Sequence, residues 1–278
     1  MTSSDTFICI DQSNNFNKIF LPLGRELQAR VRALGLKCEL SWGDVETSAR
    51  KVVFGAHSSP EYWLKKAHTN DIIVNLEPFY KAEWRDKNTN YLKLLQSRCV
   101  FEYCHLNLPY LNDGHFFKLP PLYSDLQPTA KKEIDIVFIG SRNQYRNNML
   151  NKIASENLNL KVGFNILDND SFHVFDRSWI YLNLNLDEQS VFNDYRFMSC
   201  AMSNTLFAGH SGNITNHPEV GKLIGVSIFE NDADMVIGLK DIITNKAKLF
   251  RALAIQYEIA QENRKNFDNF VKFHFGLS

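Results

Sequence analysis

The chain has 278 residues, enough for one large domain or two of ordinary size, and we expect two. Its 31 Lys and Arg residues balance 31 Asp and Glu residues, so no overall field draws it towards DNA or an anionic membrane, although a local basic groove is still allowed. Hydrophobic residues make up 44% of the chain, and no apolar run reaches the length of a membrane-spanning helix, so we expect a soluble protein.

The amino terminus, MTSSDTFICIDQ, lacks the basic segment and long apolar stretch of a secretory signal, which predicts a cytoplasmic location. The chain has five cysteines, an odd number with no C-x-x-C spacing. Several lie in apolar runs, so we expect buried, reduced thiols rather than disulfides or metal ligands. These residues are Cys9, Cys38, Cys99, Cys104 and Cys200.

The first half alternates short apolar runs with helical patterns, which indicates βα units around a mostly parallel sheet. Residues 7–10 predict a strand, and apolar residues at three-and-four spacing over 16–34 predict an amphipathic helix that ends near Gly35. The other predicted elements are strands at 36–40, 51–57, 71–77 and 99–103, a helix from about Pro60 and a helix over 89–96.

Periodicity fails over 119–133, where three prolines occur and the composition turns polar. We place the domain boundary there, with an amino-terminal domain at 1–122 and a carboxyl-terminal domain at 133–278, whose closing helix could pack back on the first. The second half predicts strands at 135–140, 160–166, 179–185, 204–209 and 225–230, and helices at 147–156, 191–202 and from Asp232 onward. The fold class is therefore α/β, with two Rossmann-like, doubly wound domains whose strand ends face a cleft.

The segment DIVFIGSRNQYRNN, residues 135–148, carries a predicted phosphate site. Its apolar run ends at Gly140 and Ser141, and Arg142 and Arg146 follow about one helical turn apart. A strand that ends in glycine before a helix brings backbone N–H groups and cationic side chains to a phosphate, and both arginines could reach a diphosphate there. Solvated arginines on an ordinary strand-to-helix turn are the alternative.

The second half resembles the donor-binding domain of GT-B glycosyltransferases, in the ordered segments IDIVFIGSRNQYRNNML, IYLNLN and YRFMSCAMSNTLFAGHSGN. In the first half, VVFGAH, IIVNLE, YLKLLQSRCVFEYCHLNLPYL and FFKLPPLY resemble landmarks of bacterial and phage GT-B-like proteins. The resemblance implies a nucleotide-sugar donor in the carboxyl-terminal domain and an acceptor over the amino-terminal one. The implied donor-binding residues are Gly140, Ser141, Arg142, Arg146, Asn183, Arg196, Ser211, Gly212 and Asn213.

One departure from the family pattern concerns the donor grip. Retaining members of the large nucleotide-sugar families carry two glutamates on the helix before the last of these strands, where this chain has Val191 and Ser199, with Asp194 out of register. Either another residue binds the ribose, or this chain binds the donor in a different way. The missing glutamate pair favours a reaction that inverts the configuration of the anomeric carbon over one that retains it. Arg196, by contrast, directly precedes FMSCAM in the same, otherwise apolar predicted helix, where a cation needs a partner.

The candidate catalytic residues are His57 and Glu77, each at the carboxyl end of a predicted strand, where α/β folds place their working residues. Sugar transfer to a hydroxyl needs a base, and either side chain can serve. A structural histidine beside Gly55 and a carboxylate that accepts from turn N–H groups are the alternatives. Asn75 and Asn107 are the predicted acceptor-binding residues, or they orient loops.

No cofactor is predicted. The chain has no H-x-x-x-H or H-E-x-x-H pattern, and we do not expect the D-x-D spacing of Asp168-Asn169-Asp170, which follows a predicted strand in the donor half, to bind a metal ion. Arginines and helix amides would then neutralise the departing diphosphate. By resemblance, the acceptor is a glycan or lipid-linked acceptor of a surface polysaccharide. A phage-type enzyme acting on hydroxymethylated bases in DNA is one alternative, and a non-catalytic nucleotide-sugar-binding module is another.

Overall fold

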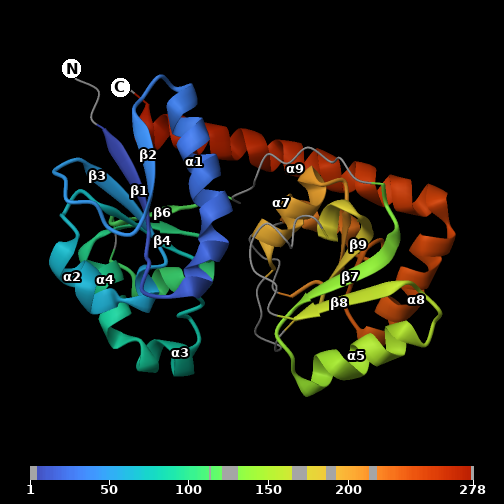
Figure 1. The fold of residues 1–278 in the computed structure, drawn as a ribbon. Helices are drawn as coiled ribbons and strands as arrows, with labels where there is room; N and C mark the ends of the chain where they lie inside the picture. Colours follow the sequence, from blue (N-terminus) through green and yellow to red (C-terminus); the bar gives the residue numbers. More distant parts are fainter. Residues whose placement is uncertain are drawn as a thin grey trace. The chain divides into compact units, whose positions relative to one another are not determined.

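The computed structural model describes residues 5–112, 114–120, 131–164, 174–185, 192–212 and 218–276. The chain divides into two compact units, Met1–Leu122 with Lys265–Ser278, and Tyr123–Arg264 (Figure 1). The last helix thus begins in the second unit and ends in the first. Each unit contains its own sheet, and every strand pair in both sheets is parallel.

The first unit contains a six-stranded sheet in the order β2-β1-β3-β4-β5-β6. Its inner strands are runs of β-branched and aromatic residues, and Val52, Val53 and Phe54 of β3 are fully buried, as a parallel sheet covered on both faces requires. The strands are β1 (Thr6–Ile10), β2 (Cys38–Trp42), β3 (Arg50–Phe54), β4 (Ile72–Asn75), β5 (Cys99–Glu102) and β6 (Phe116–Lys118).

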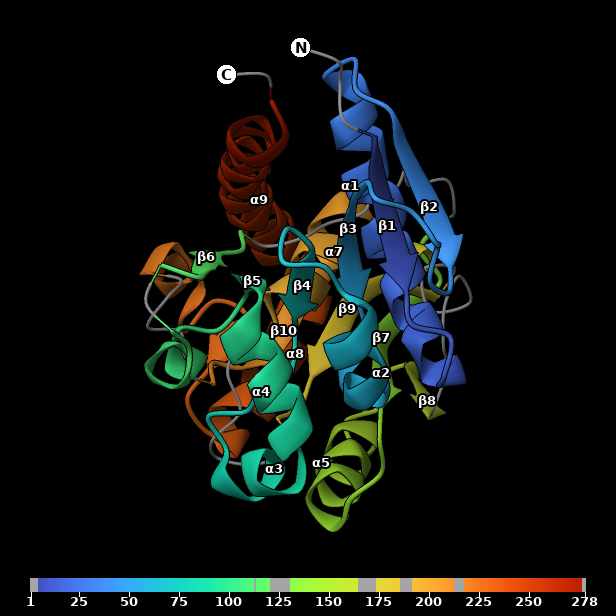
Figure 2. The ribbon, with the colours of Figure 1, turned by 90° about the vertical axis from the view of Figure 1, so that its left-hand side faces the viewer.

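Helices cover both faces of this sheet. One face packs against α2 (Pro60–Lys66) and α4 (Thr89–Ser97), which lie in front of the strands in Figure 2. On the other face, Gly24 of α1 (Leu21–Ala33) lies against Ile8 and Ile10, and Phe270 of α9 (Lys246–Phe275) packs on Phe101 with ring centres 4.7 Å apart. The remaining helical segments are η1 (Asn15–Phe20), η2 (Ala56–Ser58), α3 (Ala82–Lys87) and η3 (His105–Tyr110).

Two predicted elements of the first unit end or begin differently in the structure. The helix predicted over 16–34 starts as a 3₁₀ segment, and the α-helix begins at Leu21, because Pro22 has no N–H to donate and fits only a first turn. The strand predicted over 51–57 stops at Phe54, since Gly55 has a φ of 77° and turns the chain into η2.

The second unit contains a five-stranded sheet in the order β11-β10-β9-β7-β8. Its strands are β7 (Ile134–Gly140), β8 (Leu160–Phe164), β9 (Ser178–Asn183), β10 (Leu206–His210) and β11 (Ile228–Phe229). One face packs against α5 (Gln144–Ala154), α8 (Asp232–Thr244) and the first part of α9, and the other packs against α7 (Asp194–Met202). A further 3₁₀ segment, η4, spans Pro218–Leu223.

Three helices of this unit begin in the same way. Asn143, Asn193 and Asn231 stand immediately before α5, α7 and α8, and each side chain accepts a hydrogen bond from the backbone N–H three residues later. Such an N-cap satisfies a donor that the first turn leaves without a partner. Because of these caps, α5 begins at Gln144 and α7 begins at Asp194, whereas the sequence predicted helix starts at 147 and 191.

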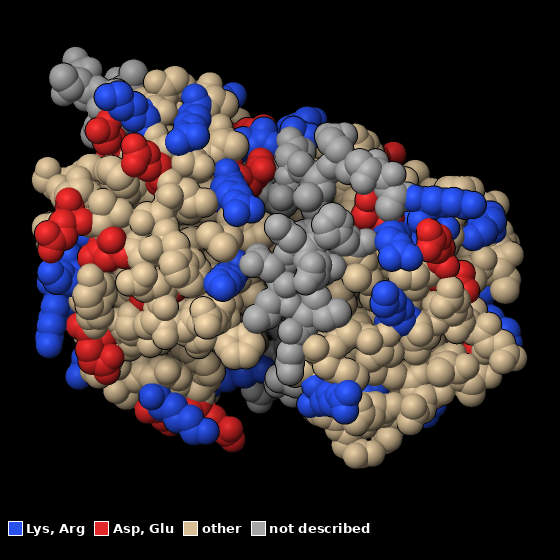
Figure 3. All heavy atoms as spheres, viewed as in Figure 1, with Lys and Arg blue, Asp and Glu red and all other residues tan. Residues whose placement is uncertain are grey.

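The two helix-covered parallel sheets confirm the predicted class of two Rossmann-like α/β domains. All five cysteines are unpaired: four are buried and Cys99 is half-buried. Burial raises the pKa of the thiols of Cys9 and Cys200, so both remain protonated at neutral pH. Within the described residues, no helix has the length and apolar character needed to cross a membrane. Basic and acidic side chains are interspersed over the surfaces that Figure 3 shows.

Candidate active site

The carboxyl edge of the first sheet brings the two predicted candidates for the base together. His57 lies in η2, directly after β3, and Glu77 follows β4. The His57 Nδ1 atom is 3.5 Å from Oε1 of Glu77, and each side chain is 23% exposed. The imidazole also packs edge-on against Phe20 and Tyr91, with ring centres 6.2 and 6.0 Å away. Both groups are thus held in place and open to solvent.

The turn that carries His57 depends on Asn17, which lies against Gly55. The Asn17 amide donates to the Asp11 carbonyl at 3.0 Å, and its oxygen accepts from the Ser58 hydroxyl at 3.2 Å. A Cβ at Gly55 would lie 2.8 Å from the Asn17 side chain, and the φ of 77° is one that L side chains rarely adopt. A glycine at this position therefore lets η2 begin directly after β3.

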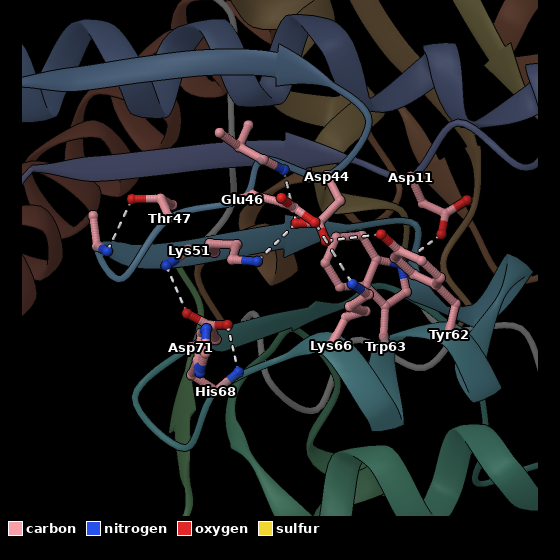
Figure 4. A network of polar contacts seen from close by, with 12 residues as sticks. Asp11, Asp44, Glu46, Thr47, Lys51, Tyr62, Trp63, Lys66, His68 and Asp71 are labelled. Carbon is pink, nitrogen blue, oxygen red and sulfur yellow. Dashed lines mark hydrogen bonds and ion pairs between the residues drawn. The ribbon is translucent and has the colours of Figure 1, made fainter.

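Two other carboxylates near this end of the sheet are engaged in structural bonds (Figure 4). Asp11, only 2% exposed, accepts from the Ser13 N–H at 2.8 Å and from the Trp63 indole N–H at 2.5 Å. Asp44 accepts from Lys51 Nζ at 2.7 Å and from the Tyr62 hydroxyl at 2.8 Å. Burial raises the pKa of Asp44, but these hydrogen bonds outweigh it and lower that pKa below its usual value.

The structure corrects the expectation that Asn75 and Asn107 bind the acceptor. Both side chains are fully buried. The Asn75 amide donates to Glu102 at 2.7 Å and accepts from the Tyr91 hydroxyl at 2.9 Å, and the Asn107 amide donates to Glu102 and to the Glu77 carbonyl at 2.8 and 2.9 Å. Their hydrogen-bonding groups are used within the protein, so these residues shape the loop after β4.

At the carboxyl edge of the second sheet, the predicted arginines differ in role. Arg142 is exposed, and its guanidinium lies 4.1 Å from the centre of the Phe164 ring. Arg146 is 7% exposed and donates to the Leu184 carbonyl at 2.7 and 3.1 Å and to the Ser141 carbonyl and hydroxyl at 3.0 and 2.8 Å. Arg146 therefore ties the loop after β7 to the end of β9 rather than extending outward, which departs from its predicted phosphate contact.

Arg196 is half-buried in the first turn of α7, with its guanidinium 5.8 Å from the centre of the Tyr181 ring. No carboxylate in the described part of the chain forms an ion pair with it. A half-buried cation beside an aromatic ring is well placed for an anionic ligand. Ser199, on the same helix, is buried and donates to the Tyr195 carbonyl at 2.9 Å.

The other predicted donor residues lie at or beside this edge. Gly140 ends β7, and Ser141 is exposed directly after it. Asn183 ends β9, is 5% exposed and lies 3.4 Å from the Asn185 side chain. Ser211 donates its backbone N–H to the Phe229 carbonyl at 3.2 Å, so that N–H is used by the sheet, and Gly212 has a φ of 55°. Asn213, Val191 and the segment 168–170 lie outside the described residues.

Sequence reasoning missed a polar cluster on the same edge. The Tyr145 hydroxyl donates to Asp232 Oδ1 at 2.7 Å and lies 3.0 Å from His210 Nε2, which is itself 3.1 Å from that Asp232 oxygen. Burial and the bond to Asp232 raise the pKa of Tyr145 above its usual value. The signal in the sequence was a histidine at a strand end, but its partners come from the starts of α5 and α8.

A pocket of about 320 Å³ lies beside β11 in this unit. Its wall includes the Phe229 ring and two carboxylates, Glu230 and Asp234. Glu230 is exposed at the end of β11 and forms no hydrogen bond or ion pair with another described residue. Among the described residues, no group of three or more His, Cys, Asp or Glu side chains could hold a metal ion.

No protein-family model and no curated protein matches the chain. The solved structure of T4 phage BGT, a β-glucosyltransferase, with UDP and Mn²⁺ is similar over 98% of this chain and 100% of that one, with a TM-score of 0.63 and 13% identity. An α-glucosyltransferase with UDP and a 13-mer DNA containing an HMU base has a TM-score of 0.58 and 9% identity, over 97% and 100% of the chains. An α1,3-fucosyltransferase with GDP has a TM-score of 0.50 and 10% identity, over 96% of this chain and 92% of that one. The chain thus has the GT-B fold that its sequence predicted.

Proposed function

We propose that this protein is a glycosyltransferase that transfers a sugar from a nucleotide-activated donor to a hydroxyl group. The pairing of His57 with Glu77 at the carboxyl edge of the first sheet carries this proposal. Such a pair can deprotonate a hydroxyl, and the fold is shared with glycosyltransferases along nearly the whole chain. Fold alone does not define chemistry, so the proposal depends on these side chains.

In the proposed reaction, Nδ1 of His57 faces Glu77 and Nε2 accepts the proton of the acceptor hydroxyl. The Glu77 carboxylate orients the imidazole and stabilises the imidazolium that forms. The acceptor oxygen attacks the anomeric carbon, the bond from that carbon to the diphosphate oxygen breaks, and the electron pair leaves with the nucleoside diphosphate. The pH dependence of turnover would report the base.

On the donor side, Arg142 and Arg196 neutralise the diphosphate, while Arg146 holds the Ser141 loop in shape. We assign the ribose hydroxyls to Glu230, because it is an exposed carboxylate in a pocket at the end of β11 and the family's glutamate pair is missing. The two arginines supply the positive charge that a metal ion would otherwise supply, so the proposed reaction needs no metal.

For the acceptor, we favour a modified base in DNA over the surface glycan that the sequence resemblance implied. Two similar structures with TM-scores of 0.63 and 0.60 are of T4 phage β-glucosyltransferase, described as a DNA-modifying enzyme, and a third holds DNA. The balanced charge argues for modest, salt-sensitive DNA affinity rather than strong binding. A glycan or lipid-linked acceptor remains the second candidate.

Labelled sugar transfer tests this function. Purified protein is incubated with a panel of labelled nucleotide-sugars and either DNA with hydroxymethylated bases, unmodified DNA or a surface glycan extract. Transfer to the hydroxymethylated DNA alone supports the favoured acceptor, and transfer to the glycan alone supports the second. Nucleotide affinity without transfer or donor hydrolysis would identify a non-catalytic binding module and refute the proposal.

A further inference from the structure

Glu102 is a buried carboxyl surrounded by hydrogen-bond donors. It ends β5, is 1% exposed, and forms no ion pair with a described residue. Its Oε2 accepts from the Asn75 amide at 2.7 Å, and its Oε1 accepts from the Asn107 amide and the Cys104 N–H, both at 2.8 Å. Burying such a group is costly, and this donor set is what compensates for the lost water.

The two amides that bind Glu102 also hold the backbone of Glu77 on both sides. The Glu77 N–H donates to the Asn75 oxygen at 3.1 Å, and the Glu77 carbonyl accepts from the amides of Asn75 and Asn107 at 3.2 and 2.9 Å. The Asn107 oxygen accepts from the Tyr80 N–H at 2.9 Å, which fixes the next turn of the same loop.

When Glu102 is ionised, this arrangement uses both of its carboxyl oxygens as acceptors. An asparagine amide has a donor end and an acceptor end, and the loop N–H groups of Glu77 and Tyr80 need the acceptor ends. Both NH₂ ends must then face Glu102, one towards each side of its carboxyl. A glutamine there keeps the size but replaces one acceptor oxygen with a donor, so one asparagine would lose its partner or flip.

We propose that Glu102 is a positioning residue that sets the Glu77 loop, and through it the His57–Glu77 pair, by orienting Asn75 and Asn107. Its part in catalysis rests on the proposed function, but its hold on the loop does not. Glu102 touches neither His57 nor the Glu77 carboxylate in the described contacts, and it acts through the backbone of Glu77. The Glu102 carboxyl thus lies at the same edge of the sheet as the His57–Glu77 pair.

The test compares Glu102→Gln with Asp71→Asn. Asp71 is a matched control: it is fully buried and accepts from two backbone N–H groups, those of Lys51 and His68, but it lies before β4, at the opposite end of the strand (Figure 4). Amide hydrogen exchange is measured at Glu77 and Tyr80 above about pH 8, where Glu102 is ionised even though burial raises its pKa to about 8. We expect Glu102→Gln to accelerate exchange there about tenfold, as the loss of a buried partner predicts, while the central β3 amides change little.

A second readout is turnover in a double-mutant cycle. Glu102→Gln should lower kcat in the wild-type background and have little further effect in Glu77→Gln, because the two changes act through one group. If Glu102→Gln does not fold, Tyr91→Phe removes the hydroxyl that donates to Asn75 and should accelerate Glu77 exchange more mildly.

Unchanged Glu77 and Tyr80 exchange, or acceleration equal to that in Asp71→Asn, would overturn the positioning role. An additive effect in the cycle would overturn its catalytic part. Wild-type protein with no turnover would refute the proposed function alone, because the exchange experiment still decides whether Glu102 holds the loop.

Discussion

Nδ1 of His57 and Oε1 of Glu77 lie 3.5 Å apart at the carboxyl edge of the first sheet, on turns that follow the neighbouring strands β3 and β4. Parallel pairing brings the two turns together, because the carboxyl ends of adjacent parallel strands meet at one edge. The pair is the basis of the proposed chemistry, and the separate roles of its members can be measured.

Replacing His57 with Gln should lower kcat by about a hundredfold or more with little change in the KM for the donor, since a positioned base contributes about 10²–10⁴-fold. Glu77→Gln should lower kcat less if Glu77 only orients the imidazole. His68→Gln, an exposed histidine of the same unit, is the control and should keep full activity. A larger loss in Glu77→Gln than in His57→Gln would make the carboxylate the base.

Removing the Arg196 guanidinium should weaken donor binding. Arg196→Ala is expected to raise the Kd for a nucleoside diphosphate about tenfold or more, since hydrogen bonds to charged groups contribute about 1.5–3 kcal/mol. Arg142→Ala should have a smaller effect, because that side chain is exposed. Calorimetry at fixed salt measures both. Arg177→Ala is the control, because Arg177 pairs with Glu133 at 2.7 Å before β9; an equal loss there would indicate a nonspecific charge effect.

The amino-acid pattern was a good guide to strands and a poor one to burial. Runs such as 135–140 fall within the observed strand β7, because continuous β-branched and aromatic residues suit a sheet covered on both faces. The three-residue strand β6 and the short helix α3 were missed, since neither is long enough to show a period. Asn75 and Asn107 were predicted either to bind the acceptor or to orient loops, and only the fold shows that both are buried.

The surroundings of the candidate donor-site residues were also not predictable from the sequence. The sequence indicated Arg142, Arg146 and Arg196 as cations at a strand-to-helix edge, but their surroundings depend on distant residues. Arg146 is bound by the Leu184 carbonyl at the end of another strand. The cluster of Tyr145, His210 and Asp232 joins three separate elements, so no spacing within the sequence could predict it.

Glu230 is expected to contribute to donor affinity through the ribose. Glu230→Gln should raise the Kd for a nucleoside diphosphate about tenfold, the usual effect of losing a hydrogen bond to a charged group. Its affinity for the matching 2′,3′-dideoxynucleotide, which lacks the ribose hydroxyls, should not change. Glu258→Gln, an exposed glutamate on α9, is the control. Equal losses for both nucleotides would show that Glu230 does not bind the ribose.

Chelation tests the proposal that arginines alone neutralise the diphosphate. Turnover should be unchanged after treatment with EDTA and removal of the chelator, and added Mn²⁺ should not increase it, because Arg142 and Arg196 supply the positive charge. A loss of activity that Mn²⁺ restores would contradict this part of the proposal and assign charge neutralisation to a metal ion. The Arg196→Ala variant is the internal control, since its defect should not respond to EDTA.

Glu102 should make the stability of the protein depend on pH. Burial raises its pKa from 4.5 to about 8, although hydrogen bonds from Cys104, Asn75 and Asn107 lower it in part. Between these two values the folded state holds a proton that the unfolded state has released, so the free energy of unfolding falls as pH rises from about 4.5 to about 8. Below about 4.5 both states are protonated, and the stabilisation is fully present.

Denaturant unfolding of wild type and Glu102→Gln at several pH values isolates this dependence, because glutamine does not titrate. The wild-type protein should lose stability relative to the variant as pH rises through that window, and the difference should level off above about 8. The stability difference between wild type and Asp71→Asn, measured in parallel, should not follow this pH trend, because both proteins keep Glu102. A constant difference between wild type and Glu102→Gln would mean that the pKa of Glu102 is not raised and that its carboxyl is ionised throughout, held by its donors alone.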